Sequence, residues 1–144
     1  MSHANSTFER NLQKANVWLK DLSEVLQLDN PDTCYQVLRA TLQTLRDRLT
    51  IEETAQLSAQ LPLILRGAYF ESWRPSDQPL KMKTKSDFLE VFLDRFNRNL
   101  DGKDPETLVR AAFEVIQRHI SPGEVHDICS MLPKEIRALW PQVA

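Results

Sequence analysis

Hydrophobic residues recur every three or four positions along most of this chain, a spacing that predicts α-helices almost throughout. The first stripe follows Ser6 and Glu9, which have the spacing of a capping box at a helix start. The second stripe follows Asn30-Pro31, a cap residue and then a proline in the first helical turn. The stripes comprise Ala15, Trp18, Leu19, Leu22, Val25 and Leu26 in the first helix, and Leu38, Leu42, Leu45 and Leu49 in the second.

Two shorter helices are predicted next, and both have recognisable boundaries. Thr50 and Glu53 repeat the capping-box pattern, and Leu61-Pro62 interrupts the helix that they begin. A further short helix is expected over about residues 63–69. The first half of the chain therefore consists of four predicted helices.

The second half repeats this order of helices and breaks. With an offset of 71 residues, six of 31 ungapped positions are identical, and the apolar stripes coincide as well. The identical pairs are Arg39/Arg110, Ala40/Ala111, Glu53/Glu124, Leu61/Leu132, Pro62/Pro133 and Arg66/Arg137. Upstream the offset becomes 74, which places Asn30-Pro31 opposite Asp104-Pro105. We therefore expect an all-α protein of about eight helices, in two tandem four-helix repeats packed as one pseudo-twofold globular bundle.

The two repeats are expected to form a single domain over residues 1–144, with repeat one at about 6–70 and repeat two at about 86–141. Residues 71–85 between them contain two prolines and no apolar period. We interpret this segment, called the strap below, as a loop or extended crossing. A connection this long in a compact domain is either functional or a structural link between the repeats.

Four stretches of the chain resemble a known family. They are residues 45–53 (LRDRLTIEE), 60–62 (QLP), 66–75 (RGAYFESWRP) and 132–140 (LPKEIRALW). In combination they are similar to the bacterial family called domain of unknown function 2267, over about residues 8–141. The resemblance implies an all-helical bacterial protein. It implies no activity, because it carries over no catalytic or binding residues.

Composition excludes several classes of protein. The chain has 144 residues, of which 42% are hydrophobic, and its 18 basic and 20 acidic residues give a net charge of −2. This is too apolar for a disordered polymer and too evenly charged for a basic nucleic-acid-binding tail. No apolar run approaches the ~20 residues of a membrane span, and no signal-peptide pattern begins the chain. The two cysteines do not form a disulfide framework, so we expect a soluble cytoplasmic protein.

Groups suited to catalysis or metal binding are few. His126 and Cys129 are spaced to meet one ion, but Asp127 lies off their shared helix face, so no four-ligand zinc set forms. Cys34 stands in a first helical turn, where a thiol pKa can fall, yet a partner such as His119 would have to come from the other half. Three glycines in all leave no phosphate-binding loop. We predict no enzyme, no metal, no cofactor and no small-molecule substrate.

The charges that occupy equivalent positions in the two halves are Arg39, Arg66 and Glu53 in the first, and Arg110, Arg137 and Glu124 in the second. They suit structural ion pairs, for instance Arg39 with Glu53 and Arg110 with Glu124, or a two-fold binding face. We favour the structural interpretation, although both glutamates also serve as predicted capping-box partners.

Residues 61–85 differ from the rest of the chain because they hold five basic and two acidic residues. We predict a candidate partner surface in this region, made of Arg66, Tyr69, Phe70, Trp73, Arg74, Lys81, Lys83 and Lys85. The favoured function is a helical protein-interaction or regulatory module, for example in a stress response, that binds a protein partner or itself. The alternative is nucleic-acid binding through the same basic aromatic segment. Equally, the aromatic residues could pack the strap onto the bundle.

Overall fold

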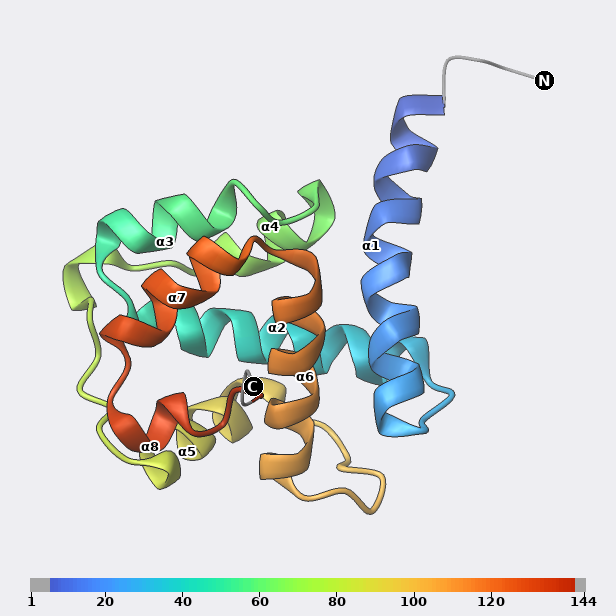
Figure 1. The fold of residues 1–144 in the computed structure, drawn as a ribbon. Coiled ribbons are helices and arrows are strands. Elements are labelled where there is room, and N and C mark those ends of the chain that lie inside the picture. The colour runs from blue at the N-terminus through green and yellow to red at the C-terminus, as the bar shows by residue number, and fades with distance from the viewer. Residues whose placement is uncertain (1–5, 142–144) are drawn as a thin grey trace.

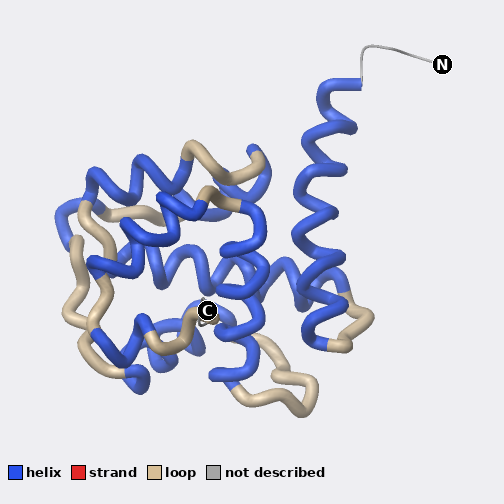
Figure 2. Tube along the Cα trace, viewed as in Figure 1, coloured by secondary structure: helices blue, strands red, loops and turns tan. Residues whose placement is uncertain are grey.

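The computed structural model describes residues 6–141, and over this range the protein is all-helical and has no strand. The described residues form eight α-helices, and Figures 1 and 2 show how loops join them. They are α1 (Ser6–Leu26), α2 (Pro31–Arg48), α3 (Ile51–Ser58), α4 (Leu63–Phe70), α5 (Lys85–Phe96), α6 (Pro105–His119), α7 (Pro122–Met131) and α8 (Lys134–Arg137), with a short 3₁₀ turn at Pro75–Asp77. The predicted fold class is confirmed.

Side-chain caps fix where several helices begin. The side chain of Asn30 accepts a hydrogen bond from the Thr33 amide at the start of α2, and Asp104 caps α6 in the same way. Thr84 and Asp87 form a full capping box at the start of α5, which the sequence analysis did not predict. The amides of residues 83 and 84 donate to the Asp87 carboxylate and hold its pKa below its usual value.

The two capping boxes predicted for α3 and α7 form only in part. Thr50 accepts from the amide of Glu53, and Ser121 accepts from the amide of Glu124. The amide of Ser121, however, donates to the side chain of Gln60 at 2.7 Å and not to Glu124. The carboxylates of Glu53 and Glu124 lie instead close to each other, so the interpretation of the two glutamates as capping-box partners is wrong.

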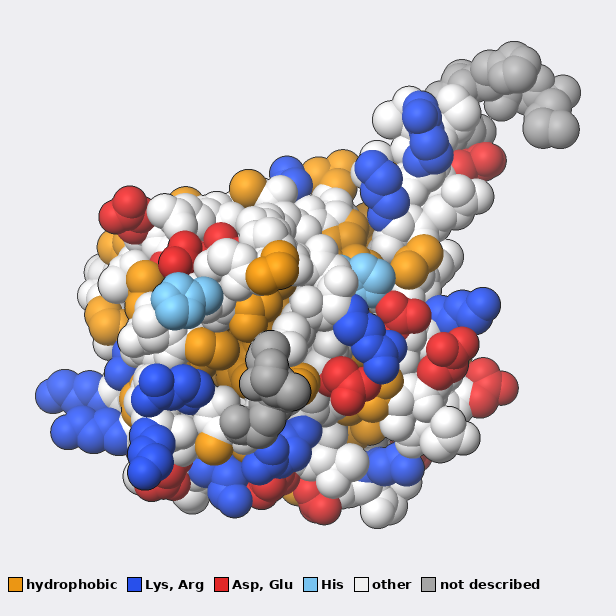
Figure 3. All heavy atoms as spheres, in the orientation of Figure 1, with side chains coloured by type: hydrophobic (Ala, Val, Ile, Leu, Met, Phe, Trp, Pro, Cys, Tyr) orange, Lys and Arg blue, Asp and Glu red, His pale blue; other side chains and the backbone are white. Residues whose placement is uncertain are grey.

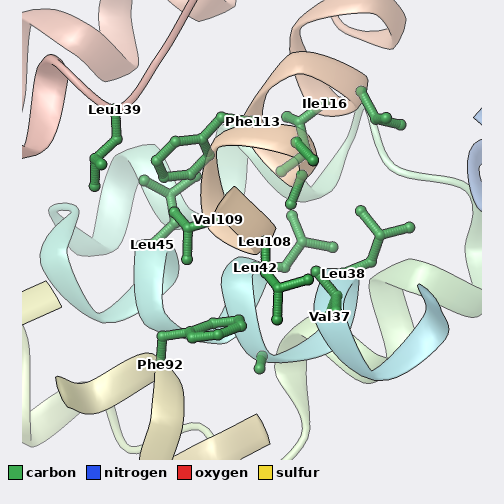
Figure 4. Packing of buried hydrophobic residues seen from close by; sticks show 14 of the residues in the cluster. Val37, Leu38, Leu42, Leu45, Phe92, Leu108, Val109, Phe113, Ile116 and Leu139 are labelled. Atoms are coloured by element: carbon green, nitrogen blue, oxygen red, sulfur yellow. The ribbon is translucent and has the colours of Figure 1, made fainter. Parts of the chain in front are cut away.

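Helix α2 occupies the centre of the molecule and packs against α1, α4, α5 and α6. Figure 4 shows its apolar side chains, among them Leu38, Leu42 and Leu45, between residues of α5 and α6. Phe113 of α6 stacks on Trp140 with ring centroids 4.3 Å apart. The predicted stripe of α2 is therefore the core face, and its burial supplies the main driving force for folding.

Apolar residues at positions that the repeat hypothesis treats as equivalent are buried in both halves of the chain. They are the pairs Leu38/Val109, Leu42/Phe113, Leu45/Ile116, Leu49/Ile120, Leu57/Ile128 and Leu65/Ile136. The two halves are in contact at several places, because α1 packs on α6, α2 on α5 and α3 on α7. The tandem repeat and its pseudo-twofold packing stay predictions.

The strap runs along the C-terminal end of α2. The amide of Leu80 donates to the Asp47 carbonyl at 2.7 Å, and Arg48 Nε donates to the Met82 carbonyl at 2.9 Å. Met82 is buried in the core. Specific hydrogen bonds therefore hold the strap against α2. Within residues 6–141, no helix combines the length and the apolar character needed to cross a membrane.

Candidate functional site

The aromatic residues of the predicted partner surface are mostly structural. Tyr69 is fully buried, and its hydroxyl donates to the carbonyl of Thr54 at 2.9 Å. Phe70 packs between the rings of Tyr69 and Trp73. The indole N–H of Trp73 donates to Gln78 at 2.7 Å. These contacts match the packing interpretation of the aromatic residues, in which they hold the strap on the bundle.

The basic residues of the same predicted surface divide into paired and free groups. Arg66 donates to the carbonyls of residues 58 and 61 at 2.8 and 3.0 Å. Arg74 lies 3.4 Å from Asp77, and Lys85 lies 2.9 Å from Glu106. Lys81 and Lys83 are exposed and have no ion pair in the described part of the chain. Two of the five basic side chains in this surface therefore have acidic partners.

The arginines shared by the two halves do not pair as predicted. Arg39 binds Glu71 at 3.0 Å, and Arg110 binds Glu106 at 2.8 Å and the carbonyl of Ala138. The suggested pairs Arg39–Glu53 and Arg110–Glu124 are therefore wrong. Lys85 and Arg110 donate to Glu106 and lower its pKa, with Lys85 giving the larger effect. Of the other two shared arginines, Arg137 is exposed, whereas Arg66 donates a hydrogen bond to the carbonyl of Ser58, before the turn into α4.

Three carboxylates from α3 and α7 come together instead. One oxygen from each of Glu53, Glu124 and Asp127 lies within 4.8 Å of the other two. Glu53 and Glu124 are only 2% and 6% exposed, whereas Asp127 is exposed. The pKa of Glu53 is raised to about 8, first by burial, then by the neighbouring carboxyl group of Glu124, and less by those of Asp127 and Glu52. Within residues 6–141 this is the one group of at least three acidic, His or Cys side chains whose ligand atoms lie close enough to share one ion.

A pocket of about 240 Å³ opens beside these carboxylates. Its lining residues are Thr50, Glu52, Glu53, Gln56, Asp127, Ser130 and Met131. The sequence pattern pointed to His126 with Cys129 and not to these three carboxylates. One signal for them was present, because Glu53 and Glu124 are identical residues at equivalent positions of the two halves. When two equivalent helices such as α3 and α7 pack together, equivalent residues can meet at their contact.

Of the predicted thiol and imidazole candidates, only His126 and Cys129 line a common pocket within residues 6–141. The thiol of Cys34 is fully buried beside the carbonyl of Leu28, and burial raises its pKa, the opposite of nucleophile activation. His119 lies 2.6 Å from Asp21 and stacks on Trp18. His126 and Cys129 line a mostly apolar pocket of about 490 Å³. In Figure 3, hydrophobic side chains gather over α6 and α7, the two helices that contribute to this pocket.

A second exposed feature is the N-terminal part of α1, which extends beyond the other helices in Figure 1. Its large apolar side chains Phe8, Leu12 and Val17 are 66%, 41% and 50% exposed. A groove of about 440 Å³ lies between α1 and the turn from α3 to α4. Lys14, Val17, Trp18, Ala59, Gln60, Leu61, Pro62, Arg66 and His119 line it. The charged groups of this lining are basic, and none is acidic.

Comparison with known proteins places most of the chain in one family. The family model described as uncharacterized conserved protein (DUF2267) matches residues 15–139. No curated protein matches the chain. The matched range begins within α1 and ends after α8, so it includes the central helix, the strap and the three carboxylates.

Proposed function

We propose that this chain, which belongs to the DUF2267 family of uncharacterized conserved proteins, is a non-enzymatic interaction module that binds an acidic amphipathic helix of a protein partner. The partner helix would lie in the groove beside α1 and contact the exposed side chain of Val17. The observation that carries the proposal is this groove, in which the half-exposed Val17 is flanked by basic residues.

The apolar stripe of α1 continues past the point where the rest of the protein covers it. Residues 8, 12, 15, 19, 22 and 26 follow the alternating four-and-three spacing of a helix interface. Ala15, Leu22 and Leu26 are buried against the bundle, whereas Phe8 and Leu12 are exposed. On a helix with 3.6 residues per turn, however, Phe8 and Leu12 lie about 140–180° around α1 from Val17, so they form a separate apolar face outside the groove. Covering a side chain of the size of Val17 contributes about 1.5–3 kcal/mol.

Charge and shape together specify the occupant. Helices bind in grooves through apolar anchors spaced three or four positions apart. Lys14 and Arg66 border the groove, and Arg10 lies one turn before Lys14 on α1. Since the groove lining contains no carboxylate, a partner with acidic residues beside its apolar anchors would gain attraction and specificity. A second copy of α1 would bring Arg10 and Lys14 toward like charges.

Selection from a display library of short helical peptides tests this proposal. We expect enrichment of peptides with apolar residues at helical spacing flanked by Asp and Glu. Binding of a selected peptide, measured by fluorescence polarisation, should weaken at least about tenfold in Val17→Glu, because Val17 lines the groove. The matched control is Leu93→Glu on α5, which replaces another partly exposed leucine and should leave binding unchanged.

A charge swap makes the test sharper. Lys14→Glu should lower the affinity of the protein for acidic peptides. A peptide in which Lys replaces the acidic residue that faces position 14 should restore binding to this variant. Selection of peptides without an acidic pattern, or equal binding by Val17→Glu, would refute the proposal. Dimerisation in light scattering that Val17→Glu abolishes would identify the occupant as a second copy and refute it equally.

The nucleic-acid alternative has less support. Lys81 and Lys83 are the strap cations without an ion pair among residues 6–141, whereas Arg74 and Lys85 have acidic partners. Affinity for a phosphate backbone depends on the number of phosphates that are neutralised, and two lysines neutralise few. We therefore propose that the partner is a protein and not a nucleic acid.

A further inference from the structure

The contact between α3 and α7 buries two carboxyl groups, and no basic side chain of the described residues pairs with them. Glu53 and Glu124 are more than nine-tenths buried. Oxygen Oε2 of Glu53 and oxygen Oε1 of Glu124 are inaccessible to solvent and accept no hydrogen bond from the described residues. Buried polar atoms almost always have a partner, and two uncompensated carboxylates are expensive to bury.

We propose that Glu53, Glu124 and Asp127 bind a divalent cation that prefers oxygen ligands, such as Ca²⁺ or Mn²⁺. The geometry is suitable, because one oxygen of each carboxylate lies within 4.8 Å of the others. Calcium–oxygen bonds are about 2.3–2.6 Å long, so two ligands across one ion are separated by at most about 5 Å. Three oxygens bound in one plane around such an ion are at most about 4.5 Å apart, so a small rotation of the side chains is enough to bring all three carboxylates onto one ion.

The residue types select the class of ion. Carboxylate oxygens suit Ca²⁺, Mn²⁺ and Mg²⁺, whereas zinc and copper favour the nitrogen and sulfur ligands that this cluster lacks. His126 and Cys129 are also on α7, but they line a different pocket. The three carboxylates carry a formal charge of −3 when ionised, so a divalent ion lowers the electrostatic cost of their burial.

The pocket beside the cluster provides access and further ligands. Asp127 is exposed and lies on the wall of this pocket, together with Thr50, Gln56 and Ser130. A cation can enter from this side, and bound water can fill the coordination positions that protein leaves open. Since Glu53 is on α3 and Glu124 and Asp127 are on α7, the ion would join helices from the two halves of the chain. This inference is independent of the proposed partner helix.

Metal binding to the full chain tests the proposal directly. Protein treated with a chelator and then dialysed would be titrated with Ca²⁺ in a calorimeter, and with Mn²⁺ while the free ion is followed by electron paramagnetic resonance. We expect one ion per chain, a dissociation constant below about 1 mM and a higher melting temperature with the ion bound.

Substitutions then locate the site. Asp127→Asn changes an exposed residue, so the chain should stay folded while affinity for Mn²⁺ falls at least about tenfold. Glu124→Gln should abolish binding, with its fold checked by circular dichroism. Glu90→Gln on α5 replaces an exposed carboxylate elsewhere and is the matched control, for which we expect unchanged affinity.

Two results would overturn the proposal. One is the absence of Ca²⁺, Mn²⁺ and Mg²⁺ binding to the folded wild-type chain, which would mean that a shared proton satisfies the two buried glutamates. The other is an equal affinity of Asp127→Asn and wild type for Mn²⁺. Neither result affects the peptide-binding test, because no groove residue belongs to the carboxylate cluster.

Discussion

Replacement of Gln78 by alanine should destabilise the protein far more than its place in a loop implies. The Gln78 side chain connects the strap to the end of α2. Its Nε2 lies 2.7 Å from the carbonyl oxygens of Arg46 and Leu49 and 2.5 Å from Thr54 Oγ1, and its Oε1 accepts from Trp73 at 2.7 Å. No other side chain in the described part of the strap bonds both to the strap and to the end of α2.

The expected cost follows from the number of bonds that the alanine variant loses. Gln78 has two N–H donors and one occupied acceptor, so about three net hydrogen bonds disappear, each worth about 0.5–1.5 kcal/mol. Water can reach part of this half-buried site and recover some of the loss. We therefore expect Gln78→Ala to lower the free energy of unfolding by about 2–3 kcal/mol.

Urea denaturation followed by circular dichroism measures this change. Gln56→Ala on α3 is the matched control, because it removes an exposed glutamine and should change stability by no more than about 0.5 kcal/mol. Gln78→Glu is nearly isosteric but places a carboxylate oxygen against the carbonyls of residues 46 and 49, so it should be at least as destabilising as alanine. Wild-type stability in Gln78→Glu would refute the assignment of Gln78 as the strap anchor.

Three further predictions concern other polar groups. The raised pKa of Glu53 means that the folded protein keeps a proton that the unfolded chain releases. With a chelator present to remove metal ions, the free energy of unfolding should therefore fall as the pH rises from about 4.5 to about 8, by at most about 1.4 kcal/mol per pH unit. Glu53→Gln should flatten this profile in urea titrations, and an unchanged slope would contradict the assignment. Asp47→Asn leaves the guanidinium of Arg46, which is 2% exposed, without its counter-ion and should cost about 3–5 kcal/mol in urea denaturation. The same change at the exposed Asp77 should cost less than about 0.5 kcal/mol. Asn30→Ala removes the cap of α2 and should cost about 1 kcal/mol, whereas Asn30→Asp should retain most of the stability in thermal melts.

Local signals predicted the helices well because the interactions that begin and end them are local. The bond from Thr33 to Asn30 spans three residues, and so does the bond from Glu53 to Thr50. Such contacts depend on residue types at fixed spacing, which the sequence displays directly. Core positions followed for the same reason, because helical periodicity places Leu42 and Leu45 on one face whichever helices cover it.

Partners of long side chains were predicted poorly because they depend on which helices pack together. Arg39 was assigned to Glu53 but binds Glu71, which is 32 positions away, and Arg66 bonds two carbonyls of a turn. A guanidinium has several acceptors of comparable chemistry within reach, so residue type alone does not select among them. The position of the helix ends decides which acceptor is used.

The sequence by itself determined that this protein is all-helical, where most of its helices begin, which residues form its core and to which family it belongs. Only the tertiary structure decided that the strap is anchored to α2, that the apolar stripe of α1 extends beyond the bundle, and that Glu53 and Glu124 meet between α3 and α7. The physical reason is the range of the interactions. Caps and periodicity act within a few residues, whereas the desolvation of a buried carboxylate depends on every helix that surrounds it.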